Sequence, residues 1–193
     1  MNISIFNKDD FETNEWSGGT TTQLYISPDS AVYAKRNFDV RISTASVSVK
    51  ESSFTPLPGV KRKLMVLDGE MVIKHDKHYT KQLKPFEVDA FNGDWQTSAM
   101  GMCTDFNVMT RGQTESELSA LSLSKGKGQD LRFEAEYGTL CLYLLSGGAS
   151  IEINKAKLHL TVGDLLILED AKSCVFPMQA NADCQMVITK IKQ

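Results

Sequence analysis

The chain has 193 residues, and its 21 Lys and Arg residues against 24 Asp and Glu residues give a formal net charge of −3 at pH 7. This balance argues against a general nucleic-acid-binding protein, because such proteins concentrate a surplus of basic residues on one face. No apolar run approaches the ~20 residues of a membrane-spanning helix, and the first residues lack the charged and apolar regions of a signal peptide. We therefore expect a cytoplasmic protein that contacts neither nucleic acid nor membrane.

Strand signals follow one another along the chain. Residues 20–27 are rich in β-branched and aromatic side chains and end at a Pro28-Asp29 turn. Residues 38–49 alternate with a period of two, which is typical of a strand with one buried face. Only residues 115–123 favour a helix, and further strand-like runs lie at 63–67, 70–74, 106–109, 140–145, 150–153, 165–168 and 186–191. Many short strands at regular spacing predict an all-β sandwich or barrel.

The second half of the chain repeats the pattern of the first. Residues 64–111 align without a gap with residues 142–189, sharing the order of strand, Gly turn and second strand, and Asp105 falls on Asp183. We interpret this self-similarity as two copies of one small β-barrel. The predicted domains are an N-terminal barrel with extra strands, 1–118, and a C-terminal barrel, 119–193, packed together as one unit.

Five short blocks occur in a fixed order in the N-terminal half of the chain. They are Trp16-Ser17-Gly18-Gly19-Thr20-Thr21, Arg41-Ile42-Ser43, Pro58-Gly59-Val60-Lys61-Arg62, Phe91-Asn92-Gly93-Asp94 and Asp105-Phe106-Asn107-Val108-Met109-Thr110-Arg111. With the repeated rhythm of strand and Gly turn, the chain resembles the HutD/Ves family of bacterial bicupins, in the cupin superfamily. The resemblance implies an all-β fold of two double-stranded β-helix, or jelly-roll, barrels with few short helices. It also implies a link to regulation of histidine utilisation or to stress responses, without an established chemistry.

The histidine-rich metal motif of many cupins is missing. Cupins that bind metal carry H-x-H-x(3,4)-E ahead of the Gly turn and a further histidine later. These slots hold Pro56, Pro58, Arg62 and Gln96 in the first barrel, and Glu134, Glu136, Leu140 and Cys174 in the second. A catalytic Zn or Fe site needs about three suitable donor side chains. We therefore expect no metal and no other cofactor.

The remaining chemistry-bearing residues suggest no catalytic group. We interpret His75 and His78 as residues of a solvated hairpin tip and His159 as a structural residue on a strand. Asp94 fits a turn better than a carboxylate pair with Asp105. There is no G-x-S-x-G motif. We interpret the four scattered cysteines as reduced, partly buried thiols. No catalytic residue is assigned, and the sequence leans against an enzyme.

Polar side chains at alternate positions of the predicted strands point to a cavity in the first barrel. Burying such polar groups without water or another hydrogen-bond partner costs free energy, so they should line a hydrated space or bind a ligand. The planar guanidinium groups of two arginines suit a carboxylate, hydroxyl and amide groups can fix its other polar atoms, and an indole can form a wall or lid. The predicted ligand-binding residues are Trp16, Thr21, Gln23, Arg41, Ser43, Arg62, Asp105 and Asn107.

Structural alternatives stay open for these residues. Arg41 can instead form an internal salt bridge with Asp105, and Trp16 can plug the open end of the barrel. Asp183, the repeat partner of Asp105, has apolar or small neighbours, which favours a scaffold or interface role for the second barrel.

Three functional hypotheses follow. The leading one is a metal-independent, non-enzymatic module that binds a small carboxylate, for which the resemblance suggests urocanate or N-formylglutamate. The second is a metal-free cupin enzyme that acts on a small acid with Asp105 as proton acceptor. The third is a structural or interaction protein whose second barrel supplies the face of a homodimer.

Overall fold

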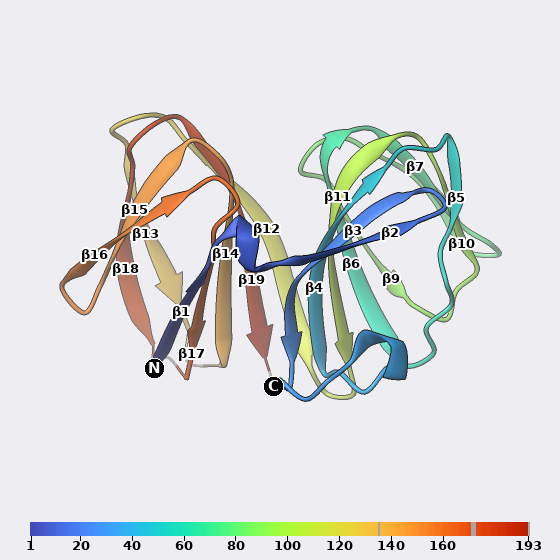
Figure 1. Ribbon diagram of the computed structural model, residues 1–193, viewed down its shortest axis with the longest axis horizontal. Helices are drawn as coiled ribbons and strands as arrows, with labels where there is room; N and C mark the ends of the chain where they lie inside the picture. The colour runs from blue at the N-terminus through green and yellow to red at the C-terminus, as the bar shows by residue number, and fades with distance from the viewer. Residues whose placement is uncertain (135, 171–172, 193) are drawn as a thin grey trace. The chain divides into compact units, whose positions relative to one another are not determined.

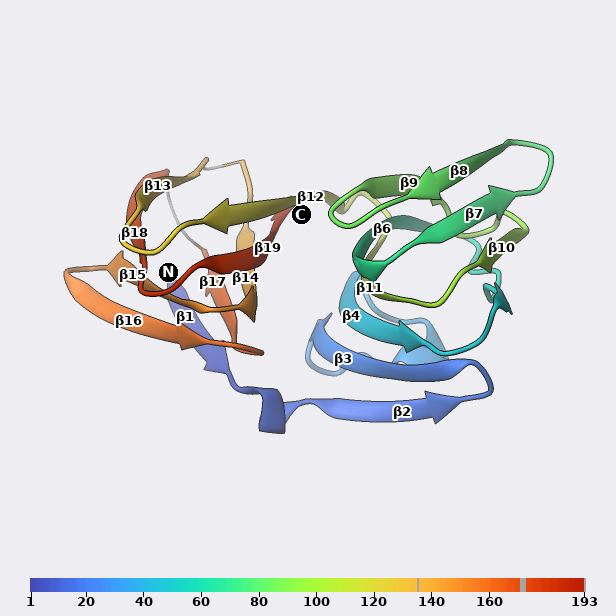
Figure 2. The same cartoon turned by 90° about the horizontal axis from the view of Figure 1, so that it is seen from above.

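The computed structural model describes residues 1–134, 136–170 and 173–192, and within them the chain is built almost entirely of strands (Figure 1). Two compact units separate by their internal contacts, Glu12–Thr114 and Met1–Phe11 with Glu115–Gln193. Each unit holds two antiparallel sheets that curve around an interior (Figure 2). The fold is therefore all-β and bicupin-like, as the sequence predicts. None of the helices described is long and apolar enough to cross a membrane.

The unit Glu12–Thr114 contains a six-stranded and a four-stranded sheet. The larger has the order β2 (Glu12–Trp16), β3 (Gly19–Ser27), β4 (Val40–Val47), β11 (Cys103–Arg111), β6 (Val60–Gly69) and β9 (Val88–Asn92). The smaller has the order β5 (Glu51–Ser53), β10 (Thr97–Met100), β7 (Met71–His75) and β8 (Tyr79–Leu83). A short 3₁₀ helix, η2 (Tyr33–Lys35), lies between β3 and β4.

The other unit combines the start of the chain with its C-terminal part. One sheet has the order β1 (Asn2–Phe6), β17 (Leu165–Glu169), β14 (Thr139–Ser146), β19 (Cys184–Lys192) and β12 (Glu115–Leu123). The other has the order β13 (Gly128–Phe133), β18 (Cys174–Ala180), β15 (Gly148–Ile153) and β16 (Ala156–Thr161). The 3₁₀ helix η1 (Lys8–Asp10) follows β1.

The unit boundaries differ from the expected division at 118/119. Strand β1 pairs along its length with β17, so the first residues complete a sheet of the C-terminal unit. Strand β12 pairs with β19 from Glu115 to Leu123, which places this segment in the same unit. The predicted helix at 115–123 is therefore wrong. Tertiary pairing with a neighbouring strand overrides the helix preference of its Glu, Ala and Leu residues.

The repeat is visible in the turns but its register differs from the ungapped alignment. Gly69 and Gly147 both adopt positive φ, at 78° and 76°. In the first barrel, Asp105 of β11 pairs with Val66 of β6, whereas in the second barrel it is Met186 of β19 that pairs with Leu144 of β14. Val66 and Leu144 correspond in the alignment, so Asp105 corresponds to Met186. Ile73 pairs with Ala99 and Ile151 pairs with Met178, so the second barrel holds one extra residue before this point and two more before the position that corresponds to Asp105. Met186, and not Asp183, is therefore the structural counterpart of Asp105.

The two interiors differ in character. The C-terminal unit is filled by an apolar cluster in which Leu140, Leu142, Met186 and Ile188 are buried together. The unit Glu12–Thr114 has smaller apolar clusters, and it also buries polar side chains from β4, β6 and β11. The four cysteines are free thiols.

Gly147 should be far less tolerant of alanine than Gly126, although both have nearly the same φ, 76° and 77°. A Cβ at Gly147 would lie 2.0 Å from the backbone oxygen of Asp183, whereas a Cβ at Gly126 meets nothing within 4 Å. We expect Gly126→Ala to cost about 1 kcal/mol for its backbone conformation, and Gly147→Ala at least about 2 kcal/mol more. Urea unfolding of both variants measures the difference. Equal losses would contradict a close approach at the β14–β15 turn.

Candidate ligand-binding cavity

A cavity of about 800 Å³ opens within the unit Glu12–Thr114. Its walls come from β2, β3, β4, β6 and β11, together with the η2 segment and residues 52–55. All eight residues that the sequence singles out line it: Trp16, Thr21, Gln23, Arg41, Ser43, Arg62, Asp105 and Asn107. The sequence did not single out Tyr33 and Phe54, which also line the cavity.

Strand register brings the polar side chains into one layer. On β11, Asn107 lies opposite Ser43 of β4, and Met109 lies opposite both Arg41 and Arg62. Alternate residues of a strand share a face, so these side chains project to the same side of the sheet.

Arg41 is held in place by neighbours other than Asp105. Its Nε donates to Oε1 of Gln23 at 3.0 Å, and its Nη1 donates to Oγ of Ser43 at 3.0 Å. The guanidinium carbon lies 4.0 Å from the centre of the Tyr33 ring. No ion pair joins Arg41 to Asp105 among the described residues, so the alternative of an internal salt bridge is not what the structure shows.

Arg62 is a buried cation whose Nε has no acceptor in the described part of the chain. It is 7% exposed, and its guanidinium carbon lies 4.8 Å from the ring centre of Phe54 and 5.2 Å from that of Phe91. Its Nε is buried with no hydrogen-bond partner among the described residues. Burial lowers the pKa of Arg62 to about 10, which still leaves the group charged at pH 7. The aromatic faces stabilise this charge but do not neutralise it.

Asp105 and Asn107 complete the polar layer. Asp105 is 5% exposed, and burial raises the pKa of its carboxyl to about 7, against the opposing effect of the nearby Arg62 charge. Oδ1 of Asn107 is buried and has no partner among the described residues. The layer therefore offers an unpaired donor, an unpaired acceptor and a carboxyl that changes charge near neutral pH. Such an arrangement suits a small anion that also carries an N–H or O–H group, because its acceptor would satisfy Nε of Arg62 and its donor would satisfy Oδ1 of Asn107.

Trp16 stands at the cavity wall. The indole is 40% exposed, which does not agree with the alternative that it plugs the barrel. It lies directly over Gly18, where an added Cβ would come within 2.1 Å of the ring. Glycine at this position therefore gives the indole its place beside the cavity.

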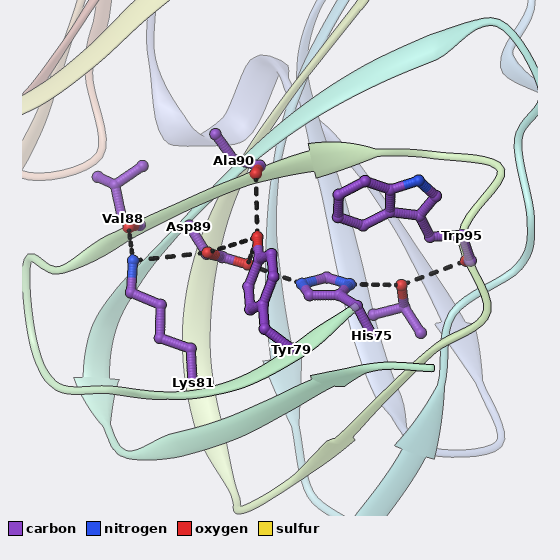
Figure 3. Close-up of polar contacts among 8 residues, drawn as sticks. His75, Tyr79, Lys81, Val88, Asp89, Ala90 and Trp95 are labelled. Carbon is purple, nitrogen blue, oxygen red and sulfur yellow. Dashed lines mark hydrogen bonds and ion pairs between the residues drawn. The ribbon is translucent and has the colours of Figure 1, made fainter. Parts of the chain in front are cut away.

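His75 corrects the expectation of a solvated hairpin tip, since it is only 1% exposed (Figure 3). One ring nitrogen, Nε2, lies 2.8 Å from Oδ2 of Asp89, and Nδ1 lies 2.8 Å from Oγ1 of Thr97. The Tyr79 hydroxyl donates to Oδ1 of Asp89 at 3.1 Å, and Nζ of Lys81 is 3.5 Å from the same carboxyl oxygen. A signal was present in the sequence, because the period of two in β7 places His75 on the same face as Met71 and Ile73.

This network has the chemistry of a structural clamp. It joins β7, β8, β9 and β10, so it ties an edge strand of one sheet to an edge strand of the other. The Thr97 hydroxyl lies 3.2 Å from the backbone oxygen of Trp95 and is buried, and does not face the cavity lined by Arg62. A buried polar network whose members are satisfied rigidifies a core.

The residues present do not fit the metal centre of the wider superfamily. Among the described residues, no three His, Cys, Asp or Glu side chains gather closely enough to hold a metal ion. Arg62 lines the cavity at the slot that a ligand glutamate would take, and a fixed positive charge there opposes a cation.

The family model for HutD matches residues 8–186, and the chain belongs to the HutD family. A search of curated proteins gave no significant match. The fold is shared with a conserved protein of unknown function from Pseudomonas aeruginosa PAO1, with a TM-score of 0.87, 21% identity and full coverage of both chains.

Two further solved structures share the fold. HutD from Pseudomonas fluorescens SBW25, in a formate condition, has a TM-score of 0.79 and 21% identity over 100% of this chain and 99% of that one. The bacterial pirin YhhW from Escherichia coli, in complex with nickel(II), has a TM-score of 0.75 and 11% identity, covering 98% of each chain. These likenesses place the chain among cupin-fold proteins.

Removing Asp89 should destabilise the protein strongly. Asp89→Ala leaves Nε2 of the buried His75 without its hydrogen-bond partner, and leaving a buried polar group unsatisfied typically costs about 1–3 kcal/mol. Asp76→Ala, an exposed change on the β7–β8 hairpin, is the matched control and should cost less than about 0.5 kcal/mol. Chemical denaturation measures both. A similar small loss in the two variants would show that the network does not clamp the sheets.

Proposed function

We propose that the unit Glu12–Thr114 is a metal-independent module that binds a small carboxylate, and that binding serves regulation. The observation that carries this proposal is Arg62, a buried charge that lines an open cavity and whose Nε has no acceptor among the described residues. Burying an unpaired charge is costly, so a protein that keeps one has a use for it. A bound carboxylate supplies the missing negative charge and the missing acceptor.

The second guanidinium supports a carboxylate over a neutral ligand. Arg41 uses Nε and Nη1 for Gln23 and Ser43, which leaves its other N–H groups available to a ligand. Its hydrogen bonds and the Tyr33 ring fix the group before any ligand arrives. Preorganised guanidinium groups lose little freedom on binding and suit a planar carboxylate.

Membership of the HutD family directs the choice of ligands. We propose histidine-degradation intermediates such as urocanate or N-formylglutamate, whose binding would tune catabolic flux or gene expression in the cytoplasm. The filled apolar interior of the C-terminal unit is in keeping with a role as scaffold, and we propose that this unit also supplies the face of a homodimer.

Asp105 favours a second candidate, a metal-free enzyme acting on a small acid. A buried carboxyl whose pKa is raised to about 7 can exchange a proton at neutral pH. In that case Asp105→Asn should abolish turnover while ligand still binds. If the wild-type protein turns over none of urocanate, N-formylglutamate, glutamate and formate, the enzyme is excluded for these acids.

Arg62→Leu should separate ligand binding from stability. The equivalent position of the second barrel is Leu140, which is fully buried, so the fold accommodates leucine there. We expect the ligand-free variant to be at least as stable as wild type, because an unpaired buried charge is replaced by an apolar group. Its stabilisation by carboxylates should be lost.

A thermal-shift screen with urocanate, N-formylglutamate, glutamate and formate provides the measurement. A ligand at roughly 100 times its dissociation constant should stabilise the wild type by about 2.7 kcal/mol. No shift with any of these acids, or an equal shift in Arg62→Leu, would contradict the proposed site. A collapse of the ligand-free variant would show that Arg62 serves the fold instead.

A further inference from the structure

Asp105 is set apart from the other acidic residues of the cavity. Among the described lining residues, Glu12 and Glu15 lie exposed on the edge strand β2, whereas Asp105 is buried on β11. Asp105 shares the cavity with Arg41 and Arg62, but neither forms an ion pair with it. Its charge is therefore offset only at a distance, by Arg62.

The groups around Asp105 come from several elements. Arg62 projects from β6 and Arg41 from β4, both carrying positive charge, and Tyr33 of η2 lies against Arg41. On the same strand the Cys103 thiol has its pKa raised to about 12, first by burial and then by the Asp105 charge. Between pH 7 and 9 this thiol keeps its proton, and Arg62, with a pKa of about 10, keeps most of its charge.

We infer that, wherever Asp105 is ionised in the free protein, the cavity takes up one proton onto Asp105 with the carboxylate that it binds. This inference rests on the proposed carboxylate site and specifies how that site is regulated. It makes the protein a sensor of its ligand and of pH together. The buried layer of the free cavity has two cations, Arg41 and Arg62, and the carboxyl of Asp105, whereas in the occupied cavity this layer has two carboxyl groups close together.

The electrostatic reason is the charge that the ligand brings. A carboxylate bound at Arg62 screens the cation that favours ionised Asp105, and it adds a negative charge in the same buried space. Two carboxylates in one low-dielectric site disfavour double ionisation, so one of them holds a proton. Asp105 already binds its proton until about pH 7 in the free protein because it is buried. Once protonated, its O–H can donate to the ligand, a charge-assisted hydrogen bond.

The sign of the pH dependence follows from linkage. Below about pH 7 Asp105 is largely protonated in both states, so affinity should change little. Above that value the free protein loses the proton that the complex retains, and affinity falls by up to tenfold for each pH unit. From pH 7 to pH 9 the dissociation constant should rise by roughly 30- to 100-fold.

The test uses formate and N-formylglutamate as probes, both fully ionised from pH 6 to pH 9. Their dissociation constants are measured with the full chain by NMR titration at constant ionic strength across this range. The wild type should show the steep rise above pH 7. Asp105→Asn cannot ionise and should bind with an affinity that is independent of pH. Asp94→Asn removes an exposed carboxyl outside the cavity and should keep the wild-type slope.

A second measurement needs no variant and covers a failure of Asp105→Asn to fold. Calorimetric titration of the wild type at pH 8, in Tris and in bis-Tris propane, gives the number of protons bound per ligand from the buffer dependence of the heat. We expect a value near one. A value near zero, or an unchanged dissociation constant from pH 7 to pH 9, would overturn the inference while leaving carboxylate binding intact.

Two other outcomes are equally decisive. Tighter binding of glutamate than of N-formylglutamate, strengthening as pH rises from 6 to 7, would show that ionised Asp105 pairs with an ammonium group and would overturn proton uptake. Binding of none of urocanate, N-formylglutamate, glutamate and formate at any pH would refute the proposed function itself, and with it this inference.

Discussion

The buried charge of Arg62 is the constraint on which the first barrel depends. A guanidinium loses several kcal/mol of hydration when it is buried, and no carboxylate among the described residues compensates it directly. Two aromatic faces and an open cavity make its burial tolerable. The interior therefore cannot close into an apolar core at this level, and the space that stays open is the candidate site.

Hydrogen-bond satisfaction distinguishes the two buried polar groups of this unit. Around His75, both ring nitrogens and the Asp89 carboxyl have partners at 2.8–3.1 Å. In the cavity, Nε of Arg62 and Oδ1 of Asn107 have none among the described residues. A buried network whose polar groups all have hydrogen-bond partners stabilises the fold, whereas a network with an unpaired donor and an unpaired acceptor needs a ligand to complete its hydrogen bonds. The same unit thus contains a clamp and a site.

The sequence could predict the residues of the cavity because a strand has a fixed period. Once β4 and β11 were recognised, alternation placed Arg41 with Ser43 and Asp105 with Asn107, each pair on one face. The same rule could have placed His75 in the interior, but its lysine-rich surroundings suggested a solvated turn.

Features that depend on long-range pairing were beyond local patterns. Tyr33 and Phe54 reach the cavity from a 3₁₀ helix and a connection, whose conformations no periodicity describes. Residues 115–123 become a strand only because β19 lies beside them. The altered register of β19 follows from extra residues in the second barrel, before and after the point where Met178 pairs with Ile151, and an alignment without gaps cannot represent them.

The site is a property of side chains and not of a special backbone. Both barrels carry a register shift at the corresponding point, between Thr104 and Asp105 on β11 and between Leu144 and Ser146 on β14. Such bulges redirect the side chains that follow them. In one barrel the layer beyond the shift holds Arg62, Asp105 and Asn107, and in the other the same positions hold Leu140, Met186 and Ile188. Because a filled apolar interior is the cheaper solution on this backbone, the polar layer of the first barrel reflects a requirement other than folding.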